Sequence, residues 1–99
     1  MLNIEKKTEG TALSVILTGR LDTTTSPELE SEMNGSLEGV TSLVIDMAGL
    51  EYISSAGLRV LLAAQKIMGK QGEMKVINVN EPIMDIFEVT GFSEILTIE

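Results

Sequence analysis

The hydrophobic positions of the chain fall into short runs that predict strands and helices in alternation. Residues 2–7 and 11–19 are rich in apolar and β-branched positions, and the turn near Gly10 between them favours a pair of strands. Residues 41–47 include three apolar positions in a row, which is typical of a central strand covered on both faces. Two more strands are predicted over residues 73–79 and 94–99.

The segment after the second strand predicts a surface helix. It begins near Ser26 and Pro27, a pair typical of a helix start, while Thr25 and Glu28 offer a competing capping box one residue earlier. Its apolar residues recur every four positions and predict one narrow buried stripe, formed by Leu29, Met33 and Leu37.

Two further helices complete the pattern. One is expected from about Ser55 to about Gly69, with apolar residues over most of its circumference, and another over residues 81–91. The alternation predicts an α/β fold with a mixed, mostly parallel sheet of four to five strands and about three main helices packed on it. Since 99 residues suit one domain, we expect a single domain over residues 1–99.

The charge of the chain narrows the classes of function. Fifteen acidic residues against seven basic ones give a net charge of −8, which disfavours binding to nucleic acid. No segment approaches the roughly 20 apolar residues that span a bilayer, so we expect no membrane insertion and a cytoplasmic location. The sequence has no cysteine and needs no oxidising compartment. We expect a monomer or a weak dimer.

The loops after the second and third predicted strands are the candidate functional region. Residues 19–27 carry Asp22, and residues 48–57 carry Ser54 and Ser55 directly before a predicted helix. Loops at the carboxyl ends of parallel strands gather at one edge of a sheet, where ligand sites are common. A helix start stabilises an oxygen anion by about 0.3–1 kcal/mol, so a phosphate on Ser55 would be tolerated.

Simpler roles remain open for the same residues. Ser54 or Ser55 can be the N-cap of the helix, although capping uses only one hydroxyl. Asp22 can face a partner or bond the backbone of its own turn. Arg59, one turn into the helix, can reach a partner or lie on a solvated helix face.

Catalysis by this region is not expected. Residues 53–57, "ISSAG", resemble a nucleophile elbow, but Ile53 stands where that turn needs glycine, and the chain has no histidine to activate a serine. Neither of the two common glycine-rich motifs that bind nucleotide phosphates, G-x-x-x-x-G-K-S/T and G-x-G-x-x-G, occurs in the sequence, so we expect no nucleotide cofactor. The carboxylates of Asp22, Asp46 and Glu51 are too scattered to predict a metal site. The least favoured hypothesis is a small hydrolase that uses Ser55 as its nucleophile. Absence of turnover with generic ester substrates would refute it.

Three segments of the sequence resemble one known family. "LTGRLDTTTSPEL", "LVIDMAGLEYISSAGLRVLL" and "VTGFSEIL" are similar to the STAS domain of bacterial anti-sigma-factor antagonists, and the central segment is the most specific. The resemblance implies a non-enzymatic regulator in a partner-switching system. In such a system the antagonist binds an anti-sigma factor that is also a serine kinase with its own ATP, and a PP2C-type phosphatase reverses the phosphorylation.

The resemblance also implies roles for particular residues. It places the phosphorylated serine at Ser55 and sets Asp22 beside it at the partner surface. Ser54 replaces the aspartate that often precedes that serine, so Ser54 is a second candidate for phosphorylation. The expected partner-binding residues are Asp22, Ser54, Ser55, Ala56, Gly57 and Arg59.

Two further expectations follow from the resemblance. Many family members carry another helix after the last strand, whereas this sequence ends at Glu99, so we expect three main helices rather than four. An alternative function compatible with the fold is a STAS interaction subunit of a transport complex, for example one that moves lipid. In that function Ser55 is only a helix cap.

Overall fold

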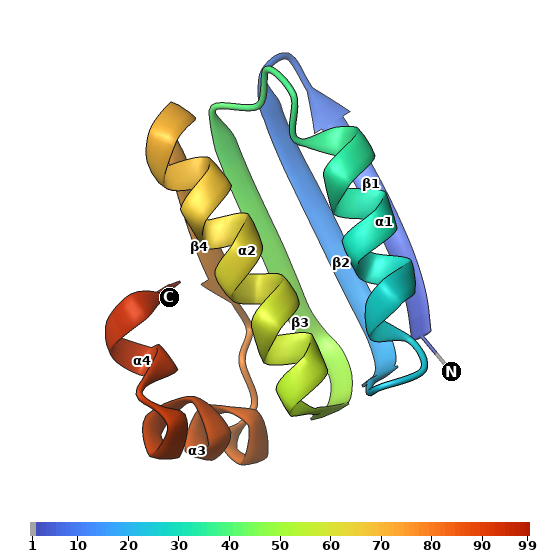
Figure 1. Cartoon of the computed structure of the whole chain (residues 1–99), viewed down its shortest axis with the longest axis vertical. Helices are drawn as coiled ribbons and strands as arrows, with labels where there is room; N and C mark the ends of the chain where they lie inside the picture. Colours follow the sequence, from blue (N-terminus) through green and yellow to red (C-terminus); the bar gives the residue numbers. More distant parts are fainter. Residues whose placement is uncertain (1) are drawn as a thin grey trace.

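One sheet of five strands forms the centre of the fold, and its strands lie side by side in the order in which they occur in the sequence. The computed structural model describes residues 2–99. Its elements, drawn in Figure 1, are β1 (Leu2–Glu9), β2 (Ala12–Leu21), α1 (Ser26–Ser36), β3 (Ser42–Ile53), α2 (Ser55–Gln71), β4 (Glu73–Ile77), α3 (Glu81–Thr90), α4 (Phe92–Ile95) and β5 (Thr97–Ile98).

The sheet is mixed and mostly parallel, as predicted. β1 pairs antiparallel with β2 through a tight turn in which Gly10 has φ 62°. The pairs β2–β3, β3–β4 and β4–β5 are parallel. Parallel neighbours need long crossover connections, and here α1, α2 and the α3–α4 segment supply them. The three predicted main helices are confirmed, and α4 adds one short turn.

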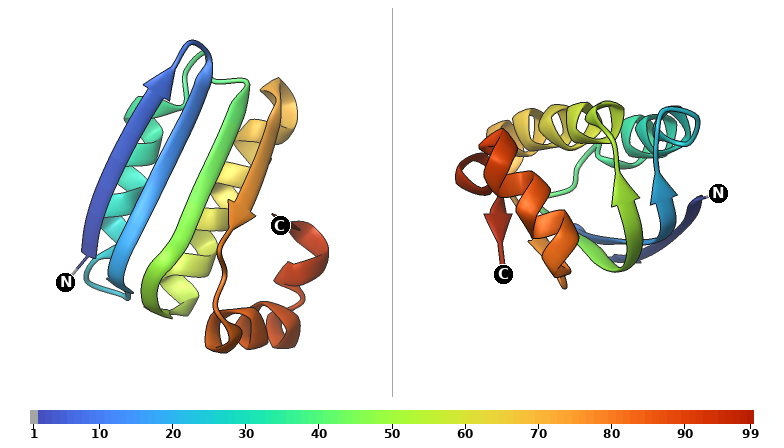
Figure 2. Two further views of the ribbon diagram at one scale, coloured as in Figure 1. Left: turned by 180° about the vertical axis from the view of Figure 1, so that it is seen from behind. Right: turned by 90° about the horizontal axis from the view of Figure 1, so that it is seen from below.

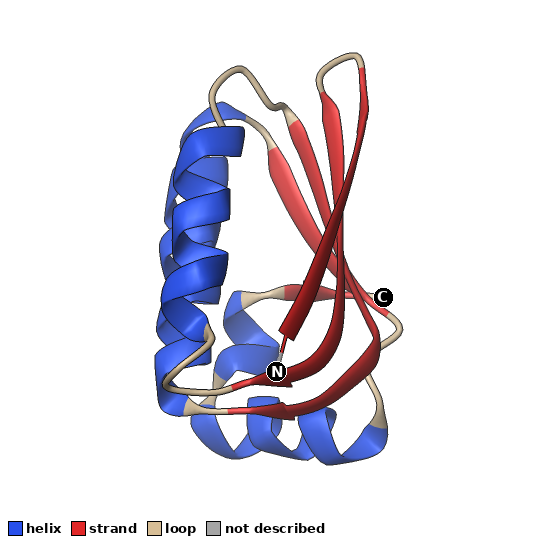
Figure 3. Ribbon diagram, turned by 90° about the vertical axis from the view of Figure 1, so that its right-hand side faces the viewer, coloured by secondary structure: helices blue, strands red, loops and turns tan. Residues whose placement is uncertain are grey.

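Helices α1 and α2 lie next to each other on one face of the sheet (Figures 2 and 3). The buried stripe predicted for α1 is confirmed, because Leu29, Met33 and Leu37 are at most 3% exposed. The prediction that residues 41–47 are covered on both faces is wrong. Leu43 and Ile45 point into the core, whereas Val44 and Asp46 are only half-buried, because none of the helices within residues 2–99 covers that part of the opposite face.

The predicted strand over residues 94–99 is shorter than expected. α3 ends at Thr90, the C-cap residue Gly91 adopts a left-handed φ of 83°, and the chain then forms α4 before the two residues of β5. β5 pairs with Lys75 and Val76 of β4. The run of apolar residues that suggested one strand is therefore split between a helical turn and a strand, a distinction that hydrophobic periodicity does not make in so short a segment.

Both strands that lead to the candidate region are longer than predicted. The register of β2 against β3 shifts twice, and each shift places an extra residue in β3. Such bulges bend a strand while its pairing continues. β3 therefore runs to Ile53, and the expected loop over residues 48–57 is reduced to Ser54. Gly49 lets β3 lie close to the Thr18 side chain of β2, since a Cβ at position 49 would lie 3.1 Å from that side chain.

Candidate functional site

The two candidate loops meet at one edge of the sheet. The Ser54 N–H donates a 2.8 Å hydrogen bond to the Leu21 carbonyl, which ties the start of α2 to the end of β2. This contact follows from the parallel pairing of β2 and β3, because both strands end on the same side. The structure thereby brings the Asp22 loop beside Ser54.

Asp22 is the centre of a turn that leads into α1. Its Oδ1 accepts hydrogen bonds from the Thr24 amide (3.0 Å) and hydroxyl (2.8 Å) and from the Thr25 amide (3.0 Å) and hydroxyl (3.1 Å). The Ser26 hydroxyl donates to the Asp22 carbonyl at 2.6 Å. The Thr25 hydroxyl also donates to the Arg20 carbonyl of β2 at 2.8 Å, and its side chain makes no capping hydrogen bond to α1, so the predicted capping box is absent. Ser26 begins α1, and Pro27 is its second residue.

The same hydrogen bonds change the acidity of Asp22. The Thr24 hydroxyl, followed by the Thr25 amide, lowers the pKa of the carboxyl from 3.8 to about 2. A carboxylate stabilised in the folded state in this way contributes stability above its unfolded pKa. That contribution is lost as the pH falls from about 4 towards 2.

Asp22→Asn is therefore expected to lower the melting temperature at pH 6 to 7 but to have a much smaller effect near pH 2, where the wild-type carboxyl is itself becoming protonated. Melting curves of both proteins across this pH range measure the difference. Asp85→Asn is the matched control, because Asp85 is an exposed α3 residue whose carboxylate accepts no hydrogen bond within residues 2–99. A pH-independent difference between wild type and Asp22→Asn would contradict the role of the charge.

The two serines have different environments. Ser54 has an extended backbone, and its Oγ accepts a 3.4 Å hydrogen bond from the Gly57 amide, so Ser54 is the N-cap of α2. Ser55 is the first residue of the helix and is exposed, and its hydroxyl forms no hydrogen bond within residues 2–99. The capping role left open between the two serines belongs to Ser54. Ser55 is the one with an accessible hydroxyl.

Gly57, in the first turn of α2, is buried. A Cβ on Gly57 would stand 2.7 Å from Leu21 Cγ, closer than Cβ atoms approach in folded proteins, and 3.0 Å from Ile53 Cγ1, which is a tight contact. Glycine therefore lets the first turn of α2 press against the ends of β2 and β3. Gly57 was predicted to bind a partner, but its position supports the surface and is not exposed on it.

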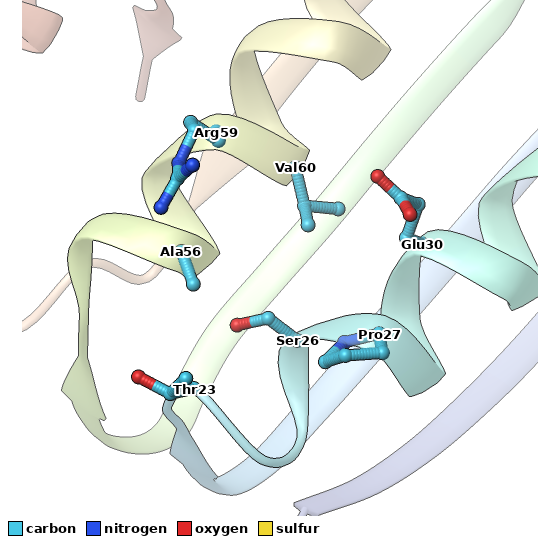
Figure 4. A pocket seen from close by; sticks show the side chains of 7 residues that line it. All are labelled: Thr23, Ser26, Pro27, Glu30, Ala56, Arg59 and Val60. Carbon is cyan, nitrogen blue, oxygen red and sulfur yellow. The ribbon is translucent and has the colours of Figure 1, made fainter.

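A shallow cleft of about 210 Å³ separates the first turns of α1 and α2. Arg59 and Ala56 of α2 form one wall, and α1 forms the other (Figure 4). Arg59 is exposed and makes no ion pair within the described part of the chain. The other residues that line the cleft were not predicted as site residues: Thr23, Ser26, Pro27, Glu30 and Val60.

A second arginine lies at the same edge of the sheet. Arg20 of β2 is the register partner of Tyr52 of β3, and its guanidinium carbon lies 4.6 Å from the centre of the tyrosine ring. Tyr52 is 39% exposed. This pair was missed because residues 48–53 were taken for a loop. Arg20 and Arg59 are the two arginines of the chain.

Two negative findings concern residues 2–99 only. No group of three or more carboxylates is close enough to hold a metal ion among them. None of their helices has the length and apolar character needed to cross a membrane.

The fold and the site define a class of small α/β domain in which a mixed sheet presents an exposed serine at the start of a helix. The STAS domain family model matches residues 3–99, so the chain belongs to the STAS family. The resemblance found in the sequence is thereby confirmed. A related sequence is the anti-sigma F factor antagonist of Paenibacillus polymyxa, which is 31% identical over 100 residues and covers 98% of this chain and 86% of the relative.

Solved structures share the fold. An anti-sigma factor antagonist from Mycobacterium paratuberculosis superposes with a TM-score of 0.89 at 23% identity, covering 99% of this chain and 85% of the other. The Bacillus cell fate determinant SpoIIAA in its phosphorylated form has a TM-score of 0.76 at 14% identity, covering 98% of this chain and 91% of the other. At these identities the similarity is one of fold.

Proposed function

We propose that this chain is an anti-sigma-factor antagonist that binds an anti-sigma factor with serine kinase activity and is switched off by phosphorylation of Ser55. The proposal rests on the different positions of the two serines at the start of α2. Ser54 caps α2, whereas the Ser55 hydroxyl is exposed and makes no hydrogen bond to any of residues 2–99. A kinase can therefore reach Ser55 without breaking the helix cap.

Two kinds of similarity support this function. The family relative from Paenibacillus polymyxa is an anti-sigma F factor antagonist. SpoIIAA, which shares the fold, has been solved in a phosphorylated form. The proposed role places the chain in the cytoplasm, where its partners are the kinase, which binds ATP itself, and a PP2C-type phosphatase. The chain acts by binding and catalyses no reaction.

The physical effect of the switch is a change of local charge. Transfer of the γ-phosphoryl group of ATP to Ser55 Oγ replaces a neutral hydroxyl with about −1.5 to −2 charges at pH 7. The start of α2 tolerates this charge, because its backbone amides and helix dipole are oriented towards it. The fold is retained, but the surface that contacted the partner changes sign locally. Binding is therefore controlled without unfolding.

The proposal predicts a single phosphate on the protein isolated from its host. Intact mass followed by fragmentation should locate it on Ser55, and the Ser55→Ala variant should lose it. Ser54→Ala should keep the phosphate while melting at a lower temperature, since loss of a serine cap costs about 1 kcal/mol. Phosphate on Ser54 would move the switch by one residue. Absence of phosphate in every growth condition would favour the alternative role in a transport complex.

A further inference from the structure

Arg59 is placed to interact with a modified Ser55. The two residues are separated by four positions on α2, and side chains at this spacing lie on the same face of a helix with Cβ atoms about 6 Å apart. Both residues are exposed. A group added to the Ser55 hydroxyl therefore enters the space that the Arg59 side chain can reach.

The orientation of Arg59 suits this interaction. Long side chains on a helix lean towards its N-terminus, and Figure 4 shows the guanidinium of Arg59 directed back over the first turn, towards Ala56. Among residues 2–99, no carboxylate lies within ion-pair distance of the Arg59 guanidinium. Glu30 lines the opposite wall of the cleft without forming an ion pair with it. The guanidinium is available to a new anion.

We propose that Arg59 binds the phosphate of phosphorylated Ser55 within the same chain. This inference rests on the proposed phosphorylation of Ser55 and explains how the phosphate changes the partner-binding surface. In the unmodified protein the Arg59 guanidinium is free to contact an acidic group of the partner. Phosphorylation engages it in a charge-assisted hydrogen bond, so one modification removes a positive charge from the surface and adds a negative one.

The experiment uses protein in which phosphoserine is incorporated at position 55 during translation, so it needs neither the kinase nor the anti-sigma factor. The second ionisation of the phosphate is followed by its ³¹P chemical shift as a function of pH. An ion pair favours the dianion and lowers this pKa. From the strength of exposed helix pairs, Arg59→Gln is expected to raise the phosphate pKa by about 0.3 relative to wild type.

Lys66→Gln is the matched control. It removes one positive charge from the same helix, but position 66 is 11 residues from Ser55, or about 16 Å along the axis, beyond the screening length of about 8–10 Å. It should leave the phosphate pKa almost unchanged, while Arg59→Lys should retain part of the effect. The other charged groups near this edge are Glu30, Asp22, Glu51 and Arg20, which are the same in all variants.

Equal phosphate pKa values in Arg59→Gln and Lys66→Gln would overturn the intrachain pair and leave the switch itself intact. Conversely, absence of phosphate from both Ser54 and Ser55 in the host would refute the proposed function, but it would not affect this measurement. Melting curves of the unphosphorylated variants check that both exposed substitutions leave the fold unchanged. A second readout is the Arg59 Nε–Hε resonance, which should shift on phosphorylation and return after phosphatase treatment.

Discussion

Phosphorylation of Ser55 is expected to weaken binding to the anti-sigma factor by about 100-fold at moderate ionic strength. The Ser55 hydroxyl is exposed, so a phosphate there meets the partner directly. Like charges brought together in an interface cost several kcal/mol, and each 1.4 kcal/mol is a tenfold change in affinity. Isothermal titration of the host kinase with the unmodified chain and with the chain carrying phosphoserine at position 55 measures the difference.

The controls separate local charge from total charge. Ser55→Glu adds about half the charge of a phosphate and should weaken binding less, whereas Ser55→Ala should bind and resist inactivation by the kinase with ATP. Ser31→Glu adds the same charge to an exposed position of α1, away from the first turn of α2. It should leave the affinity within a factor of about two, because exposed charges are screened within about 8–10 Å. Equal losses for Ser31→Glu and Ser55→Glu would refute a local switch.

Gly57→Ala is expected to destabilise the fold by about 1–3 kcal/mol, the usual cost of forcing extra volume into a packed core. The added methyl group would lie 2.7 Å from Leu21 Cγ and 2.9 Å from Leu21 Cδ2. Leu21 is fully buried and cannot move aside freely. The first turn of α2 must shift instead, which would also displace the Ser54 cap and Ser55. Urea unfolding measures the loss of stability.

Gly69→Ala is the matched control for this substitution. Gly69 belongs to the same helix, but a Cβ there meets no heavy atom within 4 Å. Glycine inside a helix is less favourable than alanine by about 0.8–1 kcal/mol, so Gly69→Ala should stabilise the protein. The two substitutions are thus expected to change the free energy of unfolding in opposite directions. A stabilising effect of Gly57→Ala would show that α2 does not press against β2 and β3 as described.

Much of the fold follows from local pattern in the sequence. The order of strands and helices was predicted correctly, because alternating apolar runs and helix-start residues report the local backbone. The parallel pairing of β2 with β3 followed from that order. It placed residue 22 and residues 54 and 55 at one edge, where the structure has them.

The tertiary structure decided how that edge is used. Only the pairing of β2 with β3 reveals the two bulges that extend β3 to Ile53, because a bulge depends on the partner strand. The Asp22 carboxylate accepts hydrogen bonds from its own turn, and the Ser54 hydroxyl, not that of Ser55, caps α2. Each outcome depends on backbone directions that distant segments impose through packing. Composition and spacing identified the candidates, but contacts between segments assigned their roles.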